Sequence, residues 1–136
     1  MNEEFWNRLA QTLHVRCKIK DPRHCSLMMP NEEPQWIFVE FSDSGDGLWI
    51  WQCQAGVRDI VNDNPDPIDL LLLNGEGLLW CYHALHAFEE GGAERLSTNL
   101  TYTFATPAND SAFAFRMLGK VLLNMNRCAV EVTSAL

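Results

Sequence analysis

The chain has 136 residues, enough for one domain, and a composition of 47% hydrophobic and 21% charged residues that is typical of folded and not of disordered chains. Its 18 acidic and 10 basic residues give a formal net charge of −8, which argues against nucleic-acid binding because that function relies on a basic surface. No stretch is apolar for long enough to cross a bilayer, and the acidic, amphipathic first residues do not resemble a secretory signal, so we expect a cytoplasmic protein without membrane contact.

The first part of the sequence predicts a helix followed by short strands. Residues 2–13 carry apolar side chains at helical spacing, including Phe5 and Leu9, after an Asn–Glu–Glu start that favours a helix N-terminus. Residues 15–20 alternate apolar and basic side chains, as a half-buried strand does. After the turn "DPRH", residues 25–29 can form another short strand.

A hairpin follows. Residues 36–41, "WIFVEF", predict a strand, and the loop "SDSGDG" leads into a return strand, "GLWIWQCQ", which residues 57–61 can extend. In a strand, Trp49 and Trp51 point to the same face. We expect one indole to serve the core and the other to lie near the rim of a partner-binding groove.

The next segments predict a short helix and a long hairpin. Residues 66–74 begin with Asp–Pro, end at Asn–Gly and contain four consecutive leucines, so this helix is apolar nearly all round and a second subunit could cover it. Residues 78–88 can be drawn as a helix or as a strand. A Gly–Gly turn and the cleanly alternating residues 96–104 favour the strand and hence a hairpin.

A last helix begins near Ser111, and residues 128–136 are expected to be a loose tail or a short strand. Together the elements predict a single α+β domain over residues 1–136. It would consist of an antiparallel sheet of about five strands with three helices, in the order α-β-β-β-α-β-β-α.

No catalytic motif and no regular metal-ligand spacing stands out, so we expect no cofactor and favour a protein that is not an enzyme. A metal site formed by His83, His86 and Glu90 would require residues 78–88 to be helical, and the glycines of "SDSGDG" occupy positions where a calcium loop needs ligands. The spacing of the soft ligands near the N-terminus matches no common zinc pattern. Those ligands are His14, Cys17, His24 and Cys25. A cysteine nucleophile with a histidine partner stays open, because such partners are adjacent in space and not in sequence.

The amphipathic first helix, the hairpin "FVEFSDSGDGLWIW" and the segment "DNPDPIDLLLLN" together resemble class I chaperones of type III secretion systems over residues 3–126. The same fold serves bacterial proteins of the YbjN type. The resemblance implies an acidic, cytoplasmic homodimer that holds an extended apolar segment of a client protein without catalysis. The implied partner-binding residues are Phe5, Leu9, Trp36, Phe38, Trp49 and Trp51, and the implied dimer-interface residues are Leu70, Leu71, Leu73, Trp80 and Tyr82.

The alternative function belongs to a different class. The chain could be a small-molecule- or metal-binding protein, or an enzyme, with an aromatic pocket between the sheet and a helix.

Overall fold

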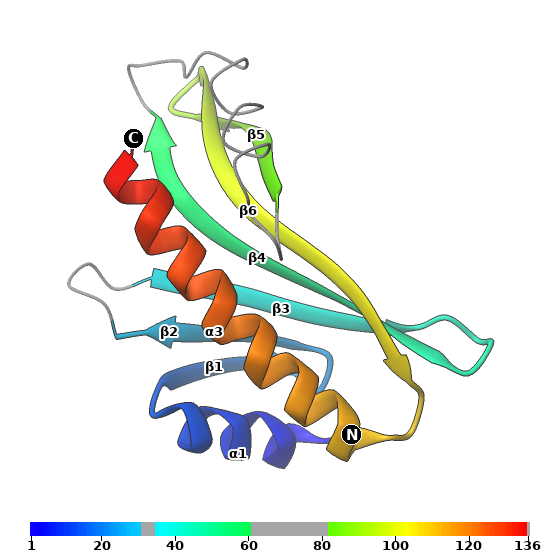
Figure 1. Ribbon diagram of the computed structural model, residues 1–136. Helices are drawn as coiled ribbons and strands as arrows, with labels where there is room; N and C mark the ends of the chain where they lie inside the picture. Colours follow the sequence, from blue (N-terminus) through cyan, green and yellow to red (C-terminus); the bar gives the residue numbers. More distant parts are fainter. Residues whose placement is uncertain (31–34, 61–81, 136) are drawn as a thin grey trace.

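The computed structural model describes residues 1–30, 35–60 and 82–135, which form a six-stranded antiparallel sheet with two helices on one of its faces (Figure 1). The elements are α1 (Glu3–Leu13), β1 (Arg16–Asp21), β2 (His24–Met29), β3 (Gln35–Asp43), β4 (Leu48–Ile60), β5 (Tyr82–Glu90), β6 (Ala93–Pro107) and α3 (Ser111–Ala135). The strands lie in the order β1-β2-β3-β4-β6-β5. This arrangement confirms the α+β class and the antiparallel sheet.

Local chemistry sets the ends of α1. Asn2 caps its start, because the side-chain oxygen accepts a hydrogen bond of 3.1 Å from the backbone N–H of Glu4. The helix ends where His14 adopts a left-handed conformation with φ 55°. The indole N–H of Trp6 donates to the carbonyl of Pro22 at 3.0 Å and so fixes the helix against the β1–β2 turn.

Glycines make both predicted hairpin turns possible. Gly45 and Gly47 have φ angles of 79° and 89° between β3 and β4, and Gly91 and Gly92 have 61° and 79° between β5 and β6. Residues other than glycine rarely adopt such backbone angles. Both hairpins are therefore confirmed.

The structure corrects the prediction for the C-terminal residues. The stretch 128–135 is neither a loose tail nor a strand, because α3 continues through it. Cys128 and Ala129 are buried and extend the apolar face formed by Leu122 and Met125, so the helix gains by continuing. Within the described residues, no helix is apolar over a length sufficient to span a membrane.

Two further predictions concern the middle of the chain. Residues 82–90 form β5, which confirms the strand interpretation for that part of residues 78–88, whereas residues 78–81 lie outside the described residues. The predicted helix at residues 66–74 also lies outside them. The sheet has six strands where about five were expected, since residues 24–29 pair along their whole length with β1 and β3.

Trp51 lies at the centre of the core between the sheet and the two helices. It is 0% exposed, and its indole N–H donates a hydrogen bond of 2.9 Å to the hydroxyl oxygen of Thr106. Five aromatic rings have their centroids between 4.7 and 6.4 Å from that of Trp51. These rings belong to Phe5, Trp6, Phe41, Trp49 and Phe104. Trp49 is buried as well, so the expectation that one of the two indoles lies at a groove rim is wrong.

Helix α3 offers a matched test of this core. Leu122 is 0% exposed and its neighbour Leu123 is 56% exposed. We expect Leu122→Ala to lower the free energy of unfolding by about 2–5 kcal/mol, because it removes buried methyl groups and leaves a cavity. Leu123→Ala should change it by no more than about 0.5 kcal/mol. Chemical denaturation followed by tryptophan fluorescence measures both, and equal losses would contradict the packing described.

Candidate functional site

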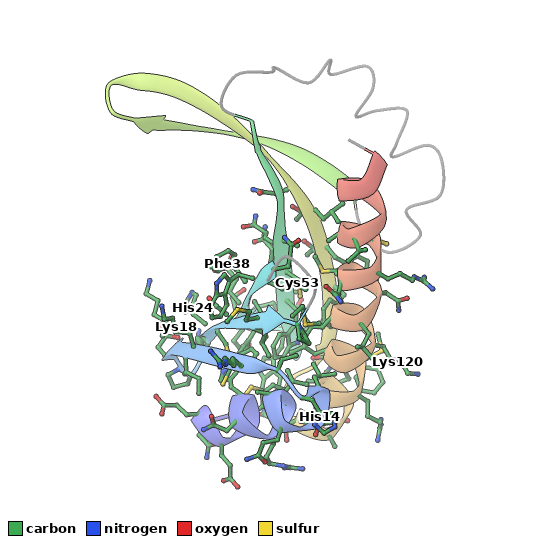
Figure 2. The ribbon with its side chains drawn as sticks, turned by 90° about the vertical axis from the view of Figure 1, so that its left-hand side faces the viewer. His14, Lys18, His24, Phe38, Cys53 and Lys120 are labelled. Atoms are coloured by element: carbon green, nitrogen blue, oxygen red, sulfur yellow. The ribbon has the colours of Figure 1, made fainter. Side chains whose placement is uncertain are left out.

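The two faces of the sheet have different surroundings because side chains alternate along each strand. Along β3, Ile37, Val39 and Phe41 are buried beneath the helices, whereas Phe38 and Glu40 are exposed on the opposite side. Figure 2 shows Lys18, His24 and Phe38 on the side of the sheet away from α3. We call this second surface the open face. Its central residues are Lys18, His24, Ser26, Met28, Trp36, Phe38, Glu40, Ile50, Gln52 and Gln54.

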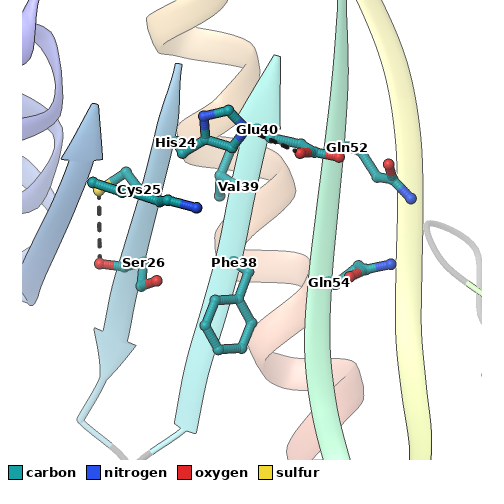
Figure 3. A pocket seen from close by; sticks show the side chains of 9 residues that line it. His24, Cys25, Ser26, Phe38, Val39, Glu40, Gln52 and Gln54 are labelled. Carbon is teal, nitrogen blue, oxygen red and sulfur yellow. Dashed lines mark hydrogen bonds and ion pairs between the residues drawn. The ribbon is translucent and has the colours of Figure 1, made fainter. Parts of the chain in front are cut away.

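Phe38 lies in the middle of the open face and is 54% exposed. It stands opposite Ser26 on β2 and opposite Gln54 on β4. A shallow pocket of about 240 Å³ lies beside it (Figure 3). The pocket is lined by Lys20, His24, Cys25, Ser26, Phe38, Val39, Glu40, Gln52 and Gln54. The open face therefore combines an exposed aromatic ring with hydroxyl, amide and charged side chains, a mixture that suits a ligand with apolar and polar parts.

His24 links two carboxylates at the edge of this pocket. Its Nδ1 lies 2.8 Å from the Asp21 carboxylate, and its Nε2 lies 3.3 Å from that of Glu40. An imidazole donates to both only as the imidazolium. The hydrogen bond from His24, with a smaller contribution from the backbone N–H of Arg23, holds the pKa of Asp21 below its ordinary value. All three side chains are well exposed, so solvent screens the electrostatic part of these contacts, and their role is chiefly to orient the side chains.

Two thiols of the described core, those of Cys25 and Cys53, are poor nucleophiles. Cys25 follows His24 in the sequence, but alternation directs the two side chains to opposite faces of β2. Burial raises the pKa of the Cys25 thiol to about 12 and that of the Cys53 thiol to about 12. Neither forms a thiolate near neutral pH, so neither is suited to nucleophilic catalysis.

The side chains that the structure describes offer no metal site. No group of three or more His, Cys, Asp or Glu side chains in that part of the chain could hold a metal ion. His83, His86 and Glu90 belong to strand β5, so they do not share the helical face that this site would require.

The six predicted partner-binding residues are divided between the two faces. Trp36 and Phe38 lie on the open face, where the Trp36 side chain is partly exposed. The other four are buried in the core and are not available to a partner in this conformation. They are Phe5, Leu9, Trp49 and Trp51. The four sheet residues of the set do not share one surface, because the pairing of Phe41 with Trp51 places the tryptophans of β4 on the face of Phe41 and not on that of Phe38.

The predicted dimer-interface residues belong to the middle of the chain. Leu70, Leu71, Leu73 and Trp80 lie outside the described residues. Tyr82 is the first residue of β5 and pairs with Thr101 of β6. The interface therefore stays a prediction.

Several polar residues of the open face were not predicted to be site residues from the sequence. The sequence did carry a signal for them: Glu40 alternates with Phe38 in "WIFVEF", and Gln52 and Gln54 alternate with the tryptophans in "GLWIWQCQ". A charged or amide side chain marks the solvent face of a strand, so these residues identify the open face. His24 had no comparable signal, because its partner Glu40 is on another strand.

The chain matches no protein-family description, and no curated protein sequence is similar enough to match it. Among solved structures it is similar to the crystal structure of YbjN from E. coli, a protein to which transcription regulation has been ascribed provisionally. The likeness covers 99% of this chain and 93% of that one, with 13% sequence identity and a TM-score of 0.53. A likeness at this identity concerns the fold alone, and the fold of this chain is YbjN-like.

The His24–Asp21 contact can be tested by titration. In His24→Gln we expect the pKa of Asp21 to rise toward its ordinary value, because the largest cause of its lowering is removed. A carboxyl whose pKa is lowered by folding contributes stability above its unfolded pKa and loses that contribution as the pH falls through the folded pKa. His24→Gln should therefore reduce the loss of stability on acidification. Carbon-13 NMR of the Asp21 carboxyl measures the shift.

His14→Asn is the matched control for this titration, since His14 lies at the end of α1 in a left-handed conformation that asparagine tolerates. It should leave the pKa of Asp21 unchanged. An unaltered Asp21 pKa in His24→Gln would contradict the assigned hydrogen bond.

Proposed function

We propose that this chain is a non-enzymatic binding protein that holds an extended, apolar segment of a partner protein on its open face. The single observation that carries the proposal is the position of Phe38, a large aromatic side chain that is 54% exposed at the centre of a sheet face. Burying apolar surface of this kind yields about 25 cal/mol per Å², so a partner that covers the ring gains affinity.

The neighbours of Phe38 suit a peptide better than a compact ligand. Trp36, two residues before Phe38 on β3, is partly exposed, and Met28 on β2 stands opposite Trp36. Ile50 adds a further partly exposed apolar side chain on β4. The backbone of an extended segment loses hydrogen bonds to water when it binds. Amide side chains among these apolar positions, such as that of Gln54, can replace those hydrogen bonds.

The mode of contact follows from the place of α1. In Figures 1 and 2, α1 lies along β1 on the side away from β2. A segment that bound here would meet the side chains of the open face and would not extend the sheet as a new strand beside β1. A protein of this type would act as a chaperone that keeps its client segment extended, as the resemblance to secretion chaperones implies.

Association of two chains is the second part of the proposal. Its support is the run of four leucines at residues 70–73, which needs apolar cover on more than one side if it is helical. In this arrangement Leu70, Leu71 and Leu73 would contact the partner subunit.

Phe38 provides the test of partner binding. We expect peptides rich in alternating apolar residues to be enriched when a displayed library of random peptides is selected on the protein. Phe38→Ser should weaken the binding of an enriched peptide by about tenfold or more, because it removes the central apolar contact. Fluorescence anisotropy of the labelled peptide measures the affinity.

Leu123→Ser is the matched control, since Leu123 on α3 is 56% exposed, much like Phe38. It should leave the affinity unchanged, and neither substitution should lower the free energy of unfolding by more than about 0.5 kcal/mol. The proposal fails if no peptide is enriched, or if the Phe38→Ser protein binds as well as the wild type.

Sedimentation equilibrium tests the association. We expect a mass twice that of the 15.5 kDa chain, and a shift toward the single-chain mass in Leu71→Ser, because a hydroxyl in an apolar interface is costly to bury. Leu123→Ser should leave the mass unchanged. A single-chain mass for the wild type at all concentrations would exclude the dimer.

A further inference from the structure

The basic residues of this acidic chain are unevenly distributed. Four of its 10 lysine and arginine residues fall within residues 16–23, a stretch with one acidic residue, while the whole chain has a net charge of −8. Three of the four belong to β1, and we call them the cationic row. They are Arg16, Lys18 and Lys20.

Alternation places the cationic row along the border of the open face. All three side chains are exposed, whereas Cys17 and Ile19 between them pack against the core. Across the strands, Lys18 stands opposite Ser26, which in turn stands opposite Phe38. The positive charges therefore lie next to the exposed aromatic part of this face.

One aromatic side chain of the open face, that of Trp36, is in contact with this charge. The Lys18 Nζ lies 5.9 Å from the centroid of the Trp36 ring, within the range of a cation–π interaction. Cation and ring thus form one mixed surface, with the charge at its edge and apolar area beside it.

The nearby carboxylates are directed at a histidine and not at the row. The carboxylates of Asp21 and Glu40 are both directed at His24, at 2.8 and 3.3 Å. Within the part of the chain that the structure describes, no ion pair involves Arg16, Lys18 or Lys20. Their charges are available to a ligand.

We propose that the segment bound on the open face is an acidic one, in which Asp or Glu side chains meet the cationic row while apolar side chains cover Phe38 and Trp36. This inference rests on the proposed function and adds the chemistry of the partner. Opposite charges across such a contact contribute to specificity and to the rate of association.

Protection of the sheet edge and binding of a nucleic acid are roles that suit the cationic row less well. Lysines on an outer strand discourage pairing with foreign strands, but α1 already lies along that side of β1. A nucleic acid would also be attracted to the row, yet its repeated phosphates would meet an overall charge of −8, and phosphate binding depends on many cationic contacts. An acidic peptide needs only a few.

The test uses synthetic peptides that share one set of alternating apolar residues and differ at the intervening positions, which are glutamate, glutamine or lysine. We expect the glutamate peptide to bind most tightly and the lysine peptide least. In the Lys18→Glu/Lys20→Glu protein the glutamate peptide should bind about tenfold more weakly and the lysine peptide more tightly. Added salt should reduce the preference in the wild type.

The control reverses the same amount of charge elsewhere. Arg116→Glu/Lys120→Glu alters two exposed cations of α3 and should leave the order of affinities unchanged. A neutral variant, Lys18→Gln/Lys20→Gln, with far-UV circular dichroism as a check of folding, should lose the preference without inverting it.

The possible failures are distinguishable. If all three peptides bound equally well and Phe38→Ser abolished this binding, the inference that the bound segment is acidic would be overturned and the proposed function would stand. Binding of none of them, together with no enrichment from the random library, would overturn both. If a single-stranded oligonucleotide bound more tightly than the glutamate peptide, and this binding depended on Lys18 and Lys20, the ligand of the open face would be a nucleic acid and not a peptide.

Discussion

The structure depends on the burial of one indole. Trp51 is in contact with rings from α1, β3, β4 and β6, so the elements that form the core converge on it. A buried indole is costly unless its N–H finds an acceptor, and Thr106 supplies one from β6 at 2.9 Å. That hydrogen bond joins neighbouring strands across residues that are 55 positions apart in the chain. It therefore helps to fix the register of β6 against β4.

A consequence of this core is that one face of the sheet receives both helices. Trp6 on α1 and the buried leucines of α3 all pack on the side of Trp51, and the Trp6 indole is held to the β1–β2 turn by its own hydrogen bond. The opposite side then carries the alternate side chains of β1, β2, β3 and the described part of β4. The open face is thus the side of the sheet opposite the aromatic cluster. Phe38 is exposed there because side chains alternate along β3.

The open face also shows how a chain of net charge −8 can present a locally positive border. The basic residues of β1 alternate with core residues, so their side chains all lie on the same side of the sheet. Nearby, the carboxylates of Asp21 and Glu40 are directed at His24 and form no ion pair with the three cations of β1. Net charge describes the whole molecule, whereas recognition by a short segment depends on the charges within about one Debye length.

The sequence by itself determined which side chains share a face, because a strand alternates and a helix repeats regardless of the rest of the molecule. It thereby determined α1 with its Asn2 cap, both glycine turns and the sharing of one face by Trp49 and Trp51. Only the tertiary structure decided which face the helices cover and which strands stand side by side. Those depend on the register of each strand pair, such as Phe41 opposite Trp51, and on contacts between strands, such as His24 with Glu40. For that reason Trp36 and Phe38 could be recognised as candidates from the sequence, while their separation from the tryptophans of β4 could not.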